Sequence, residues 1–227
     1  MSALRIISAL SLIISILPLS AQSRKGVSIL GDSYSTFQGY VSPDTNYVWY
    51  FEQPNPDLTD VSSPSQLWWH ILLRENGLRL VTNNSFSGST VCNTGYNGDD
   101  YSRRSFIARA DNLGSPDVIL VLGATNDSWA GAPIGDYVYE NPTPEQLYSY
   151  RPALAHLFRS LLDRYPGAEI HFILNTELSP EINQSTAAIC DHYGINLIRL
   201  TDIDKRAGHP TVLGMKQIAS QVATHLH

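Results

Sequence analysis

The sequence contains few basic residues relative to acidic ones. Its 227 residues include 15 Lys and Arg against 21 Asp and Glu, a formal net charge of -6 at pH 7. A chain with this balance lacks the basic footprint that neutralises a phosphate backbone, so nucleic acid and anionic membrane surfaces are excluded as favoured partners. The sequence also lacks internal repeats, charge runs and low-complexity tracts, and its 43% hydrophobic content is typical of a globular chain.

Metal-ligand patterns are missing as well. No histidine pair has a zinc spacing such as HExxH, and the two cysteines have no second pair with which to complete a zinc site. The sequence therefore predicts no metal and no cofactor. Cys92 and Cys190 could form a disulfide in an oxidising compartment, or each could be buried as a small hydrophobic side chain, and the sequence leaves both alternatives open.

The N-terminus has the pattern of a secretory signal peptide. Arg5 is followed by an apolar run over residues 6–17, which is shorter than the roughly 20 residues that a membrane span needs. Small residues then provide a cleavage region that ends at Ala21. We predict a signal peptide at 1–21 and one exported domain at 22–227, periplasmic or secreted, with no stable membrane insertion after the signal is removed. A buried N-terminal helix is the alternative.

Short apolar runs alternate with stretches of helical period along the rest of the chain. Nearly continuous aliphatic runs are typical of strands that are covered on both faces. We predict strands at 27–30, 78–81, 118–122, 170–174 and 195–200, and helices at 64–75, 102–112, 143–165, 180–193 and 210–225. Pro152 predicts a kink or break near Tyr150. This alternation predicts an α/β fold: a three-layer α/β/α sandwich with a flavodoxin-like, doubly wound parallel sheet of about five strands.

Ligand sites in open parallel sheets lie beyond the carboxyl ends of the strands. Ser33 follows the first predicted strand, Gly88 the second, Asn126 the third and His209 the fifth. Taken singly, each position has an ordinary structural interpretation. Ser33 would lie in a capping turn, Gly88 in a loop and Asn126 in an Asx-turn, and His209 is one of seven histidines.

Taken together, the four segments resemble the sequence blocks of the SGNH (GDSL-type) hydrolase family. The matching segments are GDSYS at 31–35, the Ser/Gly segment that ends at Gly88, GATND at 123–127 and GHPT at 208–211. The resemblance implies the SGNH hydrolase fold, with Ser33 as nucleophile and His209 as general base. It also implies an oxyanion hole made of the Ser33 and Gly88 backbone N–H groups and the Asn126 side chain.

One position departs from the family pattern. The family usually has an Asp three residues before its His, and Arg206 stands there in this chain. A guanidinium cannot accept the imidazole N–H. We expect Asp204 to take the role of third catalytic residue. Asp202, or a Ser-His dyad oriented by a backbone carbonyl, are the alternatives.

Two long irregular stretches, 37–63 and 126–141, contain many aromatic residues. Aromatic faces pack against sugar rings and acyl chains alike, although half or more of these residues could be ordinary core. With the resemblance, this content indicates an exported serine esterase that hydrolyses acyl esters, above all acetyl esters, on a small-molecule or polysaccharide substrate. A lipid-directed esterase or thioesterase, or a non-catalytic carbohydrate-binding protein, are the alternatives.

Overall fold

Five parallel strands form the central sheet. The computed structural model describes residues 24–226, so the predicted signal peptide lies outside the described residues. The strand order is β2-β1-β3-β4-β5, which is the predicted flavodoxin-like order. The strands are β1 (Gly26–Gly31), β2 (Arg79–Ser85), β3 (Val118–Gly123), β4 (Glu169–Leu174) and β5 (Asn196–Arg199).

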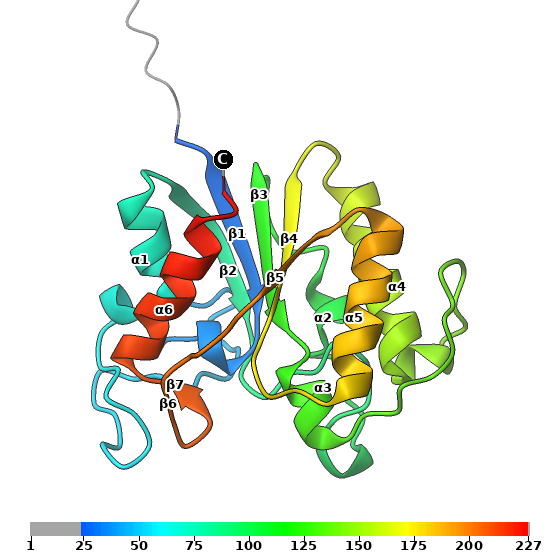
Figure 1. The fold of residues 1–227 in the computed structure, drawn as a ribbon, viewed down its shortest axis with the longest axis horizontal. Coiled ribbons are helices and arrows are strands. Elements are labelled where there is room, and N and C mark those ends of the chain that lie inside the picture. The colour runs from blue at the N-terminus through cyan, green and yellow to red at the C-terminus, as the bar shows by residue number, and fades with distance from the viewer. Residues whose placement is uncertain (1–23, 227) are drawn as a thin grey trace, which may run out of the picture.

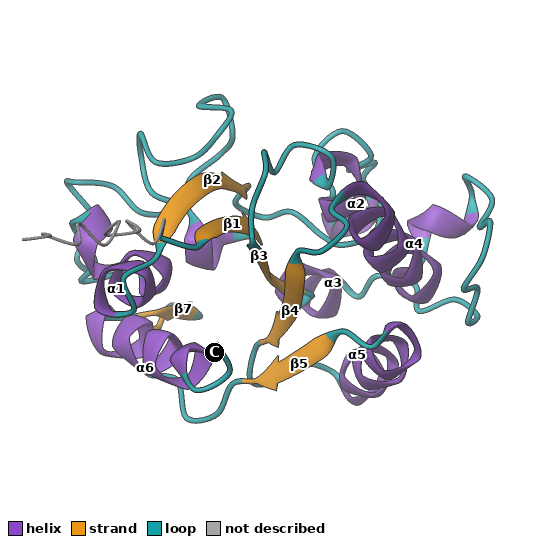
Figure 2. Ribbon diagram, turned by 90° about the horizontal axis from the view of Figure 1, so that it is seen from above, coloured by secondary structure: helices purple, strands orange, loops and turns teal. Residues whose placement is uncertain are grey.

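Helices cover both faces of this sheet, which confirms the three-layer α/β/α sandwich (Figures 1 and 2). One layer contains α1 (Trp68–Glu75) and α6 (Val212–Ala223), which pack against each other. The opposite layer contains α2 (Phe106–Arg109), α4 (Tyr150–Arg164) and α5 (Pro180–Tyr193). Beyond the carboxyl edge of the sheet lie α3 (Thr125–Ala130) and a hairpin of two short antiparallel strands, β6 (Lys205–Arg206) and β7 (His209–Pro210).

Side-chain alternation along the central strands supplies two hydrophobic cores. All six residues of β1 are buried. Val27 and Ile29 join the core beneath α1 and α6, whereas Leu30 joins the core beneath α2, α4 and α5. The same alternation runs through β3, which is also buried throughout. A continuous apolar run is therefore required because both faces of each strand are covered.

Three helical segments differ from the sequence prediction or refine it. The helix predicted at 102–112 is reduced to the four residues of α2. The predicted break near Tyr150 is confirmed. A 3-10 turn, η4 (Gln146–Tyr148), is separated from α4 by Ser149, and Pro152 lies in the first turn of α4. The helix predicted to begin at Pro210 begins instead at Val212, because Pro210 belongs to β7 and the Thr211 side chain caps α6 by accepting from the Gly214 N–H.

Both cysteines are buried and carry free thiols, so the structure favours the second alternative for Cys92 and Cys190. Burial raises the pKa of the Cys190 thiol to about 12. Separately, no helix in residues 24–226 is long and apolar enough to cross a membrane.

Candidate active site

Ser33 lies in a tight turn at the carboxyl end of β1. It opens the 3-10 helix η1 (Ser33–Ser35), and the Asp32 carboxylate caps this helix by accepting from the Tyr34 N–H at 3.0 Å. Two indoles hold the end of the turn, since the Trp68 and Trp69 Nε1 groups donate to the hydroxyl and the carbonyl of Ser35. Ser33 is thus fixed by the main chain and by buried aromatic side chains.

His209 meets Ser33 although the two residues are 176 positions apart. The His209 Nε2 atom lies 2.9 Å from the Ser33 Oγ atom, and both side chains are buried. His209 is the first residue of β7, in the hairpin that extends beyond the same sheet edge as η1. The structure therefore brings together the serine and the histidine on which the sequence hypothesis depends.

The other ring nitrogen of His209 faces a backbone carbonyl. The Ala207 oxygen lies 3.1 Å from Nδ1. Ala207 and Gly208 form the turn between β6 and β7 with φ values of 47° and 75°, the two left-handed conformations of a type I′ hairpin turn. A carbonyl can only accept a hydrogen bond, so Nδ1 carries the proton, and Nε2 is left as the acceptor that faces the Ser33 hydroxyl.

Asp204 does not make the contact expected of it. Its carboxylate accepts from the Thr211 hydroxyl, and its backbone carbonyl accepts from the Thr211 N–H at 3.1 Å. Asp204 precedes β6 and therefore braces the start of α6, because the hairpin turn reverses the chain before His209. The Ala207 carbonyl, not the Asp204 carboxylate, therefore contacts Nδ1 of His209. An orienting backbone carbonyl was one of the two alternatives to Asp204. Asp202, the other, is an exposed residue that lines a cavity next to Ile203.

Aromatic side chains enclose the imidazole. The Trp49 indole stacks on it with ring centroids 3.7 Å apart and an interplanar angle of 7°. The Tyr34 hydroxyl donates to the Gly208 carbonyl at 2.6 Å and the Tyr50 hydroxyl to the Pro210 carbonyl at 2.9 Å, so tyrosines hold the main chain on both sides of His209. Burial lowers the pKa of His209 to about 4, although the hydrogen bond to the Ala207 carbonyl opposes this shift. The imidazole is consequently neutral at neutral pH, as a general base must be.

Asn126 lies in the first turn of α3, and its amide orientation is determined by two neighbours. Its Nδ2 donates to the Ser89 carbonyl at 2.9 Å, and its Oδ1 accepts from the Tyr96 hydroxyl at 2.8 Å. Because the Ser89 carbonyl can only accept, the nitrogen must face it. One amide hydrogen remains for a ligand.

The two predicted backbone donors are free. Within residues 24–226, the N–H groups of Ser33 and Gly88 donate to no acceptor. Gly88, in the loop that follows β2, has a φ of 79°, a conformation that favours glycine. A backbone N–H without an acceptor in the protein is available to stabilise an oxyanion.

Arg109 is a buried residue of this site that the sequence analysis did not single out. Its guanidinium donates to the carbonyls of Asn84 and Gly31 and, at 2.8 Å, to the Ser89 hydroxyl. Arg109 therefore ties the ends of β1 and β2 to Ser89, whose carbonyl orients the Asn126 amide. Burial lowers the pKa of Arg109 to about 9, so the group stays charged at neutral pH. The available signal was a single charge within the apolar segment Phe106–Ala110.

Two buried carboxyl groups flank the same region. Burial raises the pKa of Asp32 to about 7 and that of Asp127 to about 6. Asp127 accepts from the N–H groups of Val91 and Cys92, so it supports the loop beyond Gly88. Within residues 24–226, one Asp32 oxygen has no hydrogen-bond partner.

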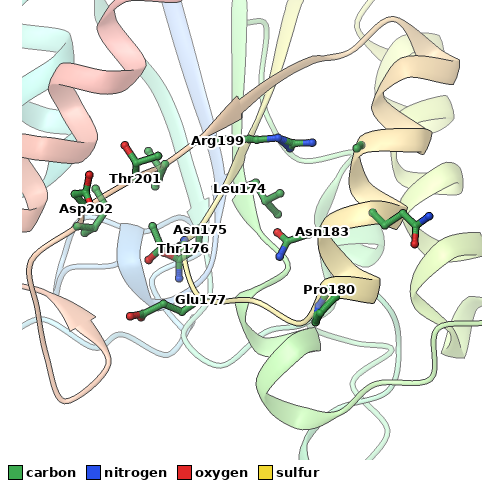
Figure 3. Close-up of a pocket in the computed structure, with 13 residues that line it drawn as sticks. Leu174, Asn175, Thr176, Glu177, Pro180, Asn183, Arg199, Thr201 and Asp202 are labelled. Carbon is green, nitrogen blue, oxygen red and sulfur yellow. Dashed lines mark hydrogen bonds between the residues drawn. The ribbon is translucent and has the colours of Figure 1, made fainter.

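A cavity of about 860 Å³ lies beside this site without including Ser33 or His209 (Figure 3). Residues from the ends of β4 and β5 and from α5 surround it. Thr176 and Glu177 on its wall accept hydrogen bonds from the Lys205 ammonium, and this links the cavity wall to the hairpin of His209. Among residues 24–226, no group of three or more His, Cys, Asp or Glu side chains is arranged to hold a metal ion.

Comparison with known proteins gives one family and close structural relatives. A model of the family "GDSL-like Lipase/Acylhydrolase" matches residues 25–226. A crystal structure assigned as a GDSL-like lipase from Bacteroides ovatus ATCC 8483 is 57% identical, with a TM-score of 0.88, and the match covers 90% of this chain and 98% of that one. A similarly assigned protein from Bacteroides uniformis ATCC 8492 is 54% identical, with a TM-score of 0.88 and coverage of 90% and 96%.

A more distant structure shares the fold alone. This is an acetyl xylan esterase from the rumen bacterium Butyrivibrio proteoclasticus, 15% identical, with a TM-score of 0.55 and coverage of 90% of this chain and 63% of that one. No curated protein matches the chain by sequence.

Proposed function

The chain belongs to the GDSL-like lipase/acylhydrolase family, the SGNH group that its motifs resemble, and from this premise we propose that it is an exported serine esterase that removes acetyl groups from carbohydrate esters. Membership supports ester hydrolysis in general. The observation that carries the catalytic assignment is the 2.9 Å contact between Ser33 Oγ and His209 Nε2. We assign Ser33 and His209 as a dyad that the Ala207 carbonyl orients.

The reaction then proceeds in two acyl-transfer steps. Ser33 Oγ attacks the ester carbonyl carbon while His209 Nε2 takes the hydroxyl proton. The N–H groups of Ser33 and Gly88 and the amide of Asn126 donate to the oxyanion. The C–O bond to the alcohol breaks, and the alcohol leaves with the proton from the imidazolium. Water repeats the sequence on the acyl-enzyme, releasing the carboxylic acid and regenerating the Ser33 hydroxyl.

The carbohydrate part of the proposal rests on exposed aromatic side chains beside His209 and in the long loop that carries Trp49. Tyr40, Tyr47 and Trp129 are 46%, 65% and 43% exposed, and the Trp129 ring lies 6.0 Å from the His209 ring. Flat aromatic faces pack well against sugar rings. Trp68 and Trp69, by contrast, are buried core residues. The acetyl xylan esterase with the same fold agrees with this substrate class by fold analogy only.

Acyl-chain preference tests the proposed activity. We expect 4-nitrophenyl acetate to be hydrolysed with a kcat/KM at least about tenfold higher than 4-nitrophenyl octanoate, because a pocket suited to a short acyl group excludes extra methylenes. We also expect the protein to release acetate from an acetylated xylo-oligosaccharide. A preference for octanoate would indicate a lipid-directed esterase. Glycan binding without turnover of any ester would indicate a binding protein.

The pH dependence tests the state of the base. Because the folded pKa of His209 is depressed to about 4, we expect the His209 ring protons of the Ser33→Ala variant to titrate by NMR near pH 4 rather than near 6.5. The neutral ring is favoured by folding, so its contribution to stability is present above pH 6.5 and is lost as pH falls through 4. A titration midpoint at 6.5 or above would contradict the assignment. Asp32→Asn serves as the control, because Asp32 is the neighbouring carboxyl whose pKa is raised to about 7.

A further inference from the structure

Arg104 is held by aromatic rings and has no ionic partner. Its guanidinium carbon lies 3.5 Å from the centroid of the Tyr101 ring and 5.6 Å from that of Phe86. No carboxylate in residues 24–226 forms an ion pair with it. Stacking occupies the face of a guanidinium and leaves the N–H donors along its edge, so this cation is oriented and its donors are unused.

The stacked arginine opens into a cavity of about 530 Å³. The rings of Tyr47 and Phe86 form one wall, with centroids 5.2 Å apart, and Arg103 is a second cation on its lining. Asp100 also lines the cavity; its Oδ1 accepts from the Ser102 N–H at 2.8 Å and the Tyr148 hydroxyl at 3.1 Å, and the charge of Arg103 helps to hold its pKa below the usual value. With Arg103 offsetting Asp100, the cavity combines flat apolar walls with one uncompensated positive charge, that of Arg104, in a protein whose net charge is -6.

Two chain connections place this cavity next to the catalytic pair. Phe86 precedes Gly88 by two residues, and Tyr47 precedes Trp49, which stacks on His209, by two residues. Two residues of chain span at most about 7 Å. The Ser87 N–H donates to the Tyr47 carbonyl at 2.8 Å, which joins the two loops to each other. The two loops that line the cavity are therefore the loops that carry Gly88 and Trp49.

We infer that this cavity is a subsite for an anionic sugar, a hexuronate unit next to the acetylated sugar of the substrate. The carboxylate meets the edge of the Arg104 guanidinium, Arg103 offsets the negative charge of Asp100, and the sugar ring lies against Tyr47. An arginine fork fits a planar carboxylate in a bidentate manner, which a neutral sugar cannot reproduce. The inference rests on the proposed function, because it specifies the substrate class of that same site.

Direct binding tests the subsite independently of turnover. The Ser33→Ala variant is titrated calorimetrically with an oligogalacturonate and with a neutral xylo-oligosaccharide of the same length. We expect tighter binding of the oligogalacturonate, and an affinity about 10-fold to 100-fold lower when Arg104→Gln is added, the range given by loss of a charged hydrogen-bonding group. Arg104→Lys should retain part of the affinity. Arg74→Gln, which alters an exposed arginine on α1 beside Glu75, is the matched control and should change nothing.

Kinetics separate failure of the subsite from failure of the esterase. In the otherwise unaltered protein, Arg104→Gln should raise KM for an acetylated oligogalacturonate and leave 4-nitrophenyl acetate hydrolysis unchanged. Equal binding of both oligosaccharides, or no effect of Arg104→Gln on oligogalacturonate affinity, would overturn the subsite while aryl acetate turnover upheld the esterase. Absence of aryl acetate turnover alongside Arg104-dependent binding would overturn the esterase and keep the subsite. If Arg104→Gln fails to fold, Arg104→Lys and the exposed Arg103→Gln carry the same comparison.

Discussion

Ser33→Ala is expected to lower kcat for aryl acetate hydrolysis by about 10⁴-fold or more, because it removes the hydroxyl that faces His209 Nε2 and that attacks the ester carbon in the proposed mechanism. KM should change little, since the oxyanion donors and the substrate walls remain. A fluorophosphonate probe should label Ser33 in the unaltered protein and nothing in the variant. Ser220→Ala, on the exposed face of α6, is the matched serine control and should retain full rate and labelling.

The histidine completes the same prediction. His209→Ala should cost nearly as much as Ser33→Ala, and the double variant no more than either alone, because residues that act as one unit are not additive. Asp204→Asn separates a dyad from a carboxylate triad. Its carboxylate bonds to Thr211, so we expect activity within about tenfold of the unaltered protein, whereas loss of a triad carboxylate costs about 10⁴-fold. A loss of that size in Asp204→Asn would contradict orientation by the Ala207 carbonyl.

Asn126→Ala is the second large effect, with an expected fall in kcat of about 10²-fold to 10³-fold and little change in KM, because an oxyanion donor acts mainly in the transition state. Tyr96→Phe removes the hydroxyl that holds the Asn126 oxygen. Loss of that one hydrogen bond is expected to lower kcat about fivefold. Tyr137→Phe, on an exposed ring away from Asn126, is its matched control.

Thermal unfolding separates catalysis from folding in these variants. Asn126→Ala also leaves the Ser89 carbonyl without its donor, so a modest decrease in melting temperature is expected. A lower melting temperature with kcat within threefold of the unaltered value would show Asn126 to be structural. A fall in kcat of about 10²-fold to 10³-fold with no more than that modest decrease in melting temperature supports the oxyanion role.

In the proposed dyad, the hairpin provides His209 with an acceptor although no acidic residue stands three positions before it. Arg206 occupies that position and turns away, and its Nη1 donates to the Pro56 carbonyl at 2.9 Å. The carbonyl of Ala207 takes the place on Nδ1. A left-handed alanine costs about 1 kcal/mol or more. Two sets of contacts stabilise the turn and offset this cost. Tyr34 and Tyr50 donate to the carbonyls of Gly208 and Pro210. Lys205 donates to Thr176 and Glu177.

The local sequence determined most of the fold. Apolar runs such as Val118–Leu122 can be satisfied only between two covering layers, so the strands, the layers and the sheet type followed from hydrophobic pattern and chain connectivity. The positions of Ser33, Gly88, Asn126 and His209 after the first, second, third and fifth strands of the sheet followed from the same pattern. The helix at 102–112 was overestimated because Arg109, which looks like a surface residue of an amphipathic helix, is buried and bonded to main-chain carbonyls.

Only the tertiary structure decided which group meets the second nitrogen of His209. A side chain such as Asp204 can be read from the sequence, whereas a carbonyl belongs to every residue, and its direction depends on the φ and ψ angles of a turn that long-range contacts stabilise. The same holds for Trp49 on His209, Tyr96 on Asn126 and Arg109 on Ser89. Each joins segments distant in the chain, so no local pattern of residues encodes the contact.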